Sequence, residues 1–399
     1  MRGGRISKFF GLFATLICWT LPVVVFAAGS DPAATVEVKK GYIDNNFAIS
    51  PDGKNVAYLH VLSDKRANLV IGRLTSKGFV KSAGENIAGH TVMPASMEFA
   101  PDGKHVFVKW KEASSGSDVD FSGGIFSLSG KLKKKLGPFE DARFRKEGSS
   151  YSIVTYRQTS GRGMVSHQIK VYSYPQMRIK GTHRMVTDQA RRLKNPNMEI
   201  LYFRDSYLKA VGKIAGRYDR KNDIRLPDKE ALYDIVKKKV ISEKPIKKAV
   251  AWEKVRLFRQ NNPPFEPIFY LEVAADGRKL NLMRKDNVQV PISLETKLER
   301  YRRDSLNQQT IGKEKALVGL TVDPQNPIIL KQRKSEPEKL HLFFVKDWKN
   351  PSAKNVLKLD SEKHVINWKY GKGVLAVMKL HRRWQLGSKK IEIHQLKLP

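Results

Sequence analysis

Short runs of alternating apolar and polar residues, separated by turn residues, extend along most of the chain. The clearest runs surround Ser-Pro-Asp-Gly-Lys in Phe47–Tyr58, and a related phrase with Ala-Pro-Asp-Gly-Lys returns 50 positions later in Met97–Val108. Proline presets the backbone at the second place of a tight turn, and glycine accepts the positive φ that closes it. Each phrase therefore predicts a β-hairpin. A hairpin that returns at this period predicts an all-β fold, most simply a β-propeller.

Weaker copies of the hairpin continue the pattern. With the proline place as the marker, the copies fall at positions 51, 101, 146, 195, 275, 324 and 370, at intervals of 50, 45, 49, 80, 49 and 46 residues. Because all intervals but one are close to a single value, the spacing favours seven four-stranded blades. Six or eight blades also fit, an eighth beginning at Ala249–Arg259. The long interval predicts an insertion near residues 205–230, where the chain becomes strongly polar.

A ring of blades also needs a closure. The strand-like segment Thr35–Lys39 precedes the first hairpin, and the last predicted blade ends at Ile391–Leu396. Pairing between these two segments would cover two sheet edges that could otherwise pair with other chains. The pattern therefore predicts that the N-terminal strand closes the ring.

The phrase Ser-Pro-Asp-Gly-Lys followed by alternating apolar residues resembles the TolB-like repeat and, more broadly, WD-repeat-like propellers. The TolB-like repeat is found in periplasmic TolB and in the propeller of prolyl-oligopeptidase-family serine peptidases. The match is close at residues 47–58 and 97–108 and partial at 273–282. The resemblance implies a propeller fold and a location outside the cytoplasm. It says little about function, because propellers serve many unrelated roles.

Two departures limit what the resemblance implies. TolB has a separate α/β domain before its propeller, whereas here we expect the propeller to begin soon after the mature N-terminus. The peptidases add an α/β-hydrolase domain that presents its nucleophile in Gly-x-Ser-x-Gly. This pentapeptide does not occur in the chain. Peptidase activity is therefore not expected.

The first 27 residues have the pattern of an export signal. A basic segment precedes the apolar run Phe9–Phe26, and small residues stand before a cleavage point after Ala27. An uncleaved membrane anchor is the alternative, because the run is near the ~20 residues that span a bilayer. Pro22 and the small-residue site favour cleavage. We therefore expect a signal peptide at 1–27 and one soluble propeller domain at 28–399, periplasmic or secreted.

The sequence offers little recognisable catalytic chemistry. Its single cysteine, Cys18, lies in the signal, the nine histidines are scattered, and no zinc-protease or nucleotide-binding motif occurs. Asp118–Gly123 resembles the first half of a calcium loop, but Ser129 stands where the bidentate glutamate is needed. We therefore predict no metal, no cofactor and no catalytic residue. A metal site assembled from separate blades, as in some polysaccharide lyases with TolB-like propellers, is the alternative.

Charge is the strongest functional indication. Lysine and arginine number 74 against 39 acidic residues, a net charge of +35, which falls to +32 when the signal is removed. Such an excess attracts polyanions, although edge lysines can also simply prevent sheets from aggregating. The candidate anionic-ligand residues stand in short basic runs: Lys133, Lys134, Lys135, Lys237, Lys238, Lys239, Arg382 and Arg383.

Together these features predict an exported, non-catalytic propeller that acts as a binding or scaffold module in the cell envelope. The expected partner is an envelope protein or an anionic polysaccharide such as lipopolysaccharide. Nucleic acid is disfavoured, because the protein is exported and its aromatic residues form no regular stacking platform. The alternative is a polysaccharide lyase or hydrolase whose site is assembled at the channel mouth.

Overall fold

The computed structural model describes residues 32–63, 66–86, 94–111, 121–246, 270–273, 279–283, 289–293, 306–312, 315–322, 339–346, 352–360, 365–380 and 387–399. Within these ranges the regular structure consists of β-strands, and no helix capable of crossing a membrane is found. Several sequence predictions lie outside the described residues: the signal peptide 1–27, the eighth-blade start at Ala249–Arg259, the markers at 275 and 324, Asp118 and Asp120, and Arg382 and Arg383.

The strands pair antiparallel in sheets that follow one another along the chain. The first sheet contains β2 (Tyr42–Ile49), β3 (Asn55–Ser63), β4 (Arg66–Thr75), β5 (Gly78–Asn86) and the distant β30 (Gly387–Ser388). The second contains β6 (Pro94–Phe99), β7 (His105–Lys111), β8 (Phe121–Ser127) and β9 (Leu132–Phe139). The third contains β10 (Asp141–Glu147), β11 (Ser150–Gly161), β12 (Met164–Tyr174) and β13 (Ile179–Asp188).

The fourth sheet contains β14 (Arg192–Leu193), β15 (Met198–Arg204), β16 (Lys209–Ile214), β19 (Lys229–Asp234) and β20 (Lys239–Pro245). A two-stranded ribbon, β17 (Tyr218–Asp219) with β18 (Ile224–Arg225), leaves this sheet between β16 and β19. The fifth sheet contains β21 (Tyr270–Val273), β22 (Lys279–Met283) and β23 (Gln289–Ser293).

The sixth sheet contains β24 (Leu306–Gly312), β25 (Lys315–Val322), β26 (Lys339–Lys346) and β27 (Ser352–Asp360). The last sheet contains β28 (Val365–Gly371), β29 (Val374–Leu380), β31 (Lys390–Gln395) and, from the other end of the chain, β1 (Ala34–Glu37).

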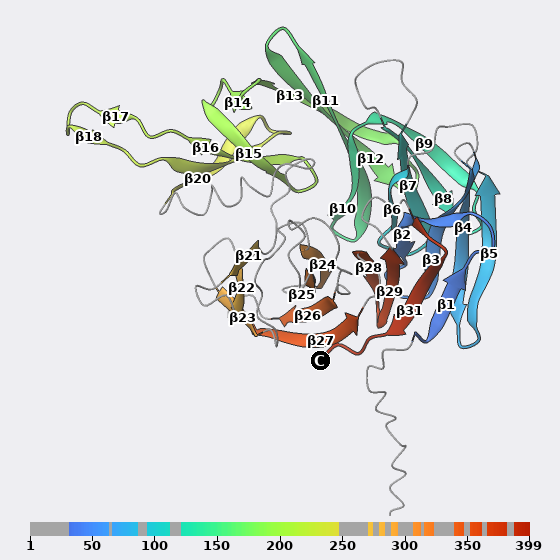
Figure 1. The fold of residues 1–399 in the computed structure, drawn as a ribbon. Helices are drawn as coiled ribbons and strands as arrows, with labels where there is room; N and C mark the ends of the chain where they lie inside the picture. The colour runs from blue at the N-terminus through green and yellow to red at the C-terminus, as the bar shows by residue number, and fades with distance from the viewer. Residues whose placement is uncertain are drawn as a thin grey trace, which may run out of the picture.

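The sheets are arranged in a ring (Figure 1), which confirms the predicted β-propeller. The first strand of the first sheet, β2, contacts both β6 and β28, the first strands of its neighbours, as expected for the innermost strands of blades. Among the described residues six sheets have four or more strands, and the fifth has three. Six full blades fall within the predicted range of six to eight, one below the favoured count.

The repeated turn has the predicted geometry. In the first copy, Gly53 donates its backbone N–H to the Ser50 carbonyl oxygen (2.8 Å) and adopts φ +73°. The Asp52 carboxylate accepts a hydrogen bond from the backbone N–H of Lys54 (3.0 Å). The second copy repeats this arrangement, with Gly103 at φ +71°. The turn is therefore specified locally by proline, aspartate and glycine.

The N-terminal strand closes the ring, as predicted. β1 pairs with β31, with Val36 opposite Ile391. On either side of the strand, Ala33 donates to the Ile393 carbonyl (2.7 Å) and Val38 to the Lys389 carbonyl (3.0 Å). Val36 is fully buried in the core shared by the first and last sheets. The closure thus combines backbone pairing with apolar packing.

The core is divided among the spaces between neighbouring sheets. Along β3, Val56 and Tyr58 pack toward the last sheet, whereas Ala57 and Leu59 pack toward the second sheet. Successive strand residues point to opposite faces. Because both faces of this strand are covered, residues 56–59 form a continuous apolar run in place of the apolar–polar alternation expected around the turn.

Side-chain amides connect the innermost strands of adjacent sheets. Gln309 in β24 donates to the Tyr370 carbonyl oxygen (2.8 Å) and accepts from the Tyr370 backbone N–H (3.1 Å) in β28. Asn367 in β28 donates to the carbonyl oxygen of Asn45 in β2 (2.6 Å). The first strands of the sheets have backbone groups that no neighbouring strand pairs with. These side-chain hydrogen bonds satisfy such groups.

Candidate binding site at the inner pocket and the charged face of β10

The inner pocket lies between the first strands of the first, second, sixth and last sheets. Its volume is about 770 Å³, within the range of ligand-binding pockets in proteins. β2, β6, β24 and β28 supply most of its wall, and the remaining lining residues are Pro51, Lys315, Phe344, Lys372, Leu398 and Pro399. The pocket is therefore built by the ring and not by any single blade.

The wall of the inner pocket combines aromatic and charged side chains. Phe99, Phe344 and Trp368 line it and are largely buried in the cores between sheets. Glu98 and Lys369 stand beside these aromatic residues in β6 and β28. Apolar surface with a few charged groups is the usual composition of a binding pocket.

Glu98 has an unusual electrostatic setting. Part of the Glu98 residue is exposed. Protein atoms nevertheless surround its carboxyl group, and the loss of solvation raises its pKa to about 7. Arg143 and Lys369 oppose this increase by favouring the carboxylate, and Asp141 reinforces it. Burial in turn lowers the pKa of Lys369, while the charge of Glu98 acts to raise it. Glu98 therefore changes charge near neutral pH.

Replacing Glu98 with Gln is expected to change the pH dependence of stability. A carboxyl whose pKa is higher in the folded than in the unfolded chain binds a proton more tightly when folded, so its contribution to stability falls as pH rises from about 4.5 to about 7. The melting temperature of Glu98→Gln relative to the parent should therefore increase between pH 5 and pH 8. A constant difference across this interval, measured by calorimetry, would contradict the assignment.

The pocket borders a charged strand. Residues at alternate positions of β10, namely Asp141, Arg143, Arg145 and Glu147, are charged, and we call them the charged face of β10. The other side of the strand carries Ala142 and Phe144, which pack against the second sheet. This alternation follows from the two-residue period of a strand. The charged residues are therefore directed together, away from the core of the second sheet.

The end of this face nearest Glu98 is a partly buried polar cluster around Asp141. Its carboxylate pairs with the Arg143 guanidinium (2.9 Å) and with the Lys109 ammonium (3.8 Å), and it accepts a hydrogen bond from the Tyr207 hydroxyl. Burial lowers the pKa of Lys109, and the Asp141 charge partly offsets this. The Lys109 ammonium also lies 4.1 Å from the centroid of the Phe121 ring. Each charge in the cluster is thus compensated, as burial requires.

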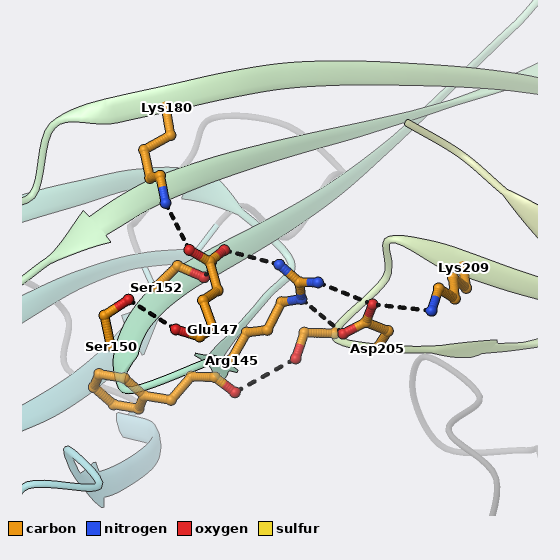
Figure 2. Close-up of polar contacts among 9 residues, drawn as sticks. Arg145, Glu147, Ser150, Ser152, Lys180, Asp205 and Lys209 are labelled. Atoms are coloured by element: carbon orange, nitrogen blue, oxygen red, sulfur yellow. Dashed lines mark hydrogen bonds and ion pairs between the residues drawn. The ribbon is translucent and has the colours of Figure 1, made fainter. Parts of the chain in front are cut away.

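The other end of the face connects the third and fourth sheets. Figure 2 shows the Arg145 guanidinium between two carboxylates, bonded to both oxygens of Asp205 (2.7 and 3.1 Å) and to one oxygen of Glu147 (2.8 Å). Lys180 pairs with Glu147 (2.6 Å), and Lys209 pairs with Asp205 (3.6 Å). Bidentate pairs of this kind have strict geometry, so the network fixes how the turn after β15 meets β10.

That turn has a strained backbone. Asp205, Ser206 and Tyr207 have φ of 49°, 50° and 73°, the left-handed region that residues with a Cβ rarely adopt. The conformation sends Tyr207 into the interior, where it is fully buried and stacks on Tyr156 at 4.4 Å with an interplanar angle of 10°. Tyr207 burial and the Arg145–Asp205 pair stabilise the strained turn.

The lysines predicted from the sequence lie on the surface of two separate sheets. Lys133, Lys134 and Lys135 are exposed on β9, the edge strand of the second sheet. Lys237 and Lys238 are exposed in the turn between β19 and β20, and Lys239 begins β20 of the fourth sheet. The third sheet stands between them in the ring, so the two runs are separate patches.

Three histidines of the described chain, His60, His105 and His167, have hydrogen-bond partners. His167 is buried within hydrogen-bond distance of Tyr156 (2.7 Å) and Thr187 (3.0 Å), and burial lowers its pKa to about 4. His60 and His105 likewise contact a backbone carbonyl and a tyrosine hydroxyl. In the ranges that the structure describes, no three His, Cys, Asp or Glu side chains are grouped as a metal site requires.

The pocket residues Glu98 and Lys369, and Arg143 of β10, whose charge acts on Glu98, were not predicted from the sequence. Each is a charged residue flanked by apolar residues in the first strand of its sheet, as in Met97-Glu98-Phe99 and Trp368-Lys369-Tyr370. This pattern is the one signal that could have identified them, because a charge in an otherwise buried strand must face a cavity or a partner.

No protein-family model and no curated protein matches the sequence. Similar solved structures include TolB from Acinetobacter baumannii, with 17% identity, coverage of 61% of this chain and 52% of that chain, and a TM-score of 0.29. The β-propeller domain of the Trilobed protease from Pyrococcus furiosus has 11% identity, coverage of 88% and 78%, and a TM-score of 0.32. A chain of the Mitotic Checkpoint Complex has 8% identity, coverage of 98% and 99%, and a TM-score of 0.39. The propeller assignment itself rests on strand pairing.

Proposed function

We propose that this protein is an exported, non-catalytic β-propeller that acts as a binding or scaffold module in the cell envelope, in the periplasm or after secretion. Its proposed ligand is an anionic polymer, such as an acidic polysaccharide or lipopolysaccharide. The observation that carries this proposal is the exposure of basic runs at the edges of the second and fourth sheets, on a chain of net charge +35.

Five lysines of these runs differ from other lysines of the same surface. Among the described residues, Lys133, Lys134 and Lys237–Lys239 have no carboxylate partner. By contrast, Lys229 and Lys244 of the fourth sheet pair with Glu243 (3.0 Å) and Glu230 (3.4 Å). Unpaired ammonium groups at a surface are free to neutralise the charges of a polyanion and release its counterions.

The inner pocket supports an envelope protein as a second kind of partner. Its aromatic wall, beside Glu98 and Lys369, fits an apolar side chain with a neighbouring charged group better than it fits a flexible polyanion. The polymer would then occupy the outer edges of the ring and the protein its inner end. Simultaneous binding would make the propeller a scaffold.

Catalysis by a polysaccharide lyase or hydrolase is supported less well. Such a site needs several His, Asp, Glu or Gln side chains to converge at the channel mouth. Within the described residues, the pocket wall provides Glu98 and Gln309. The Gln309 amide is already engaged with the backbone of Tyr370, which leaves Glu98 as the one side chain of these four types still available in the described wall.

Salt elution from immobilised heparin tests the polymer proposal. The mature protein should bind and elute at a salt concentration that falls clearly when Lys133, Lys134 and Lys135 are all changed to Gln, with affinity reduced by about tenfold. The matched control changes Lys40, Lys77 and Lys81, also exposed, to Gln and so has the same net charge. Equal elution of the two triple variants would show that total charge, rather than the β9 run, determines binding and would overturn the proposal.

A further inference from the structure

The β17–β18 ribbon extends away from the rest of the fourth sheet (Figure 1). Every residue from Arg220 to Pro227 is exposed. The ribbon pairs Tyr218 with Arg225 and Asp219 with Ile224, and the Leu226 backbone N–H donates to the Arg217 carbonyl oxygen (3.0 Å). A two-stranded ribbon of this size buries no core of its own.

Polar contacts nevertheless hold the ribbon in a defined shape. At its base the Asp228 carboxylate accepts from the Gly216 backbone N–H (2.8 Å) and pairs with Lys213 (2.6 Å). At its tip the Asp219 carboxylate accepts from the Asn222 amide (2.8 Å), and Tyr218 donates its hydroxyl hydrogen to Asp223. The ribbon is therefore a supported projection with fixed ends.

Exposed apolar side chains are concentrated in this part of the molecule. Tyr218, Ile224 and Leu226 are 57%, 51% and 41% exposed. Five of the nine large exposed apolar residues in the described chain lie between Tyr218 and Ile241. Because single exposed apolar residues are ordinary but clusters mark contact surfaces, the concentration points to a partner that covers the ribbon.

The charges of the ribbon indicate the chemistry of that partner. Four basic residues, Arg217, Arg220, Lys221 and Arg225, accompany two acidic ones between positions 217 and 226. Ile224 begins β18, and Leu226 directly follows it with its backbone N–H bonded to the Arg217 carbonyl oxygen (3.0 Å), which continues the pairing. The two side chains are two positions apart along this extended segment and therefore share a face. Aliphatic residues interleaved with arginine and lysine suit the boundary between headgroups and acyl chains of an anionic bilayer. The core of a protein–protein interface, by contrast, is depleted of charge.

We propose that the β17–β18 ribbon is a membrane-contact element that places Ile224 and Leu226 against a bilayer containing anionic phospholipid. The four basic residues would contact lipid phosphates, with their aliphatic stems along the apolar surface. This surface is separate from the β9 lysines, and the inference does not depend on the polymer proposed for them.

Vesicle flotation tests the inference with the mature protein. Vesicles of phosphatidylcholine containing about one third phosphatidylglycerol should carry the protein with them at low salt, and pure phosphatidylcholine vesicles should not. Changing both Ile224 and Leu226 to Ser should weaken binding to the anionic vesicles by about tenfold, although the net charge is unchanged. Tyr218 is left intact so that the hairpin keeps its tip hydrogen bond.

The matched control changes two exposed apolar residues elsewhere, Val80 and Ile179, which are 54% and 61% exposed, to Ser. This control should bind anionic vesicles like the parent. The inference is overturned if the parent does not float with anionic vesicles, if neutral vesicles bind it equally, or if the ribbon variant and the control bind alike. Melting curves of both variants verify that each remains folded.

Discussion

Deletion of residues 34–40 is expected to lower the melting temperature of the mature protein by about 6 °C or more. The deletion removes β1, and with it Val36 and Val38, which are buried between the first and last sheets. Burial of two valines contributes about 3–6 kcal/mol, and loss of the strand also exposes Ile391 and Ile393 of β31. In a chain of this length 1 kcal/mol corresponds to roughly 1 °C or slightly more.

Two point variants separate closure from nonspecific effects of shortening the chain. Val36→Ala should lower the melting temperature by a few degrees, because it leaves a cavity in the shared core. Thr35→Ala lies one position away in the same strand, on the exposed face, and should change it little. Scanning calorimetry measures all three proteins. A deletion variant that melts like the parent would show that β1 does not close the ring.

The hairpins and the closure could be predicted because the information that specifies them is local. Proline, aspartate and glycine at residues 51–53 determine the turn, and Gly53 has the positive φ that the turn needs. The number of blades is not specified by local sequence in the same way. Regular spacing favoured seven blades, but the stretch containing β21–β23 has three strands among the described residues, and the fourth sheet has five. Spacing along the chain does not report how many strands join each sheet.

The inner pocket could not be predicted for a different reason. Glu98, Arg143 and Lys369 belong to three different sheets, and they influence one another only because the ring brings first strands together. The opposite is true of the basic runs. They are conspicuous in the sequence because their lysines are consecutive, yet the second and fourth sheets hold them apart. Sequence proximity and spatial proximity therefore identify different residues in a propeller.

The second large effect is expected at Tyr207. Truncation of this fully buried side chain in Tyr207→Ala should cost about 3–5 kcal/mol, or roughly 4–6 °C in melting temperature for a chain of this length. The variant loses the stacking on Tyr156 and leaves the Asp141 carboxylate without the tyrosine hydroxyl. Tyr207→Phe keeps the ring and removes only the hydroxyl, so it should cost about 1–3 kcal/mol.

The comparison of the two variants shows what holds the strained turn. If the buried aromatic ring of Tyr207 stabilises the turn, Tyr207→Phe keeps most of the stability and Tyr207→Ala does not. Tyr218→Ala is the matched control, because Tyr218 is 57% exposed and its truncation should cost little. Equal melting temperatures for Tyr207→Ala and Tyr218→Ala would mean that the Arg145–Asp205 pair alone supports the turn. Three consecutive residues with positive φ carry an intrinsic cost. The ion pairs of Asp205 with Arg145 and Lys209 are partly exposed and contribute little, so the buried aromatic ring of Tyr207 must supply the rest.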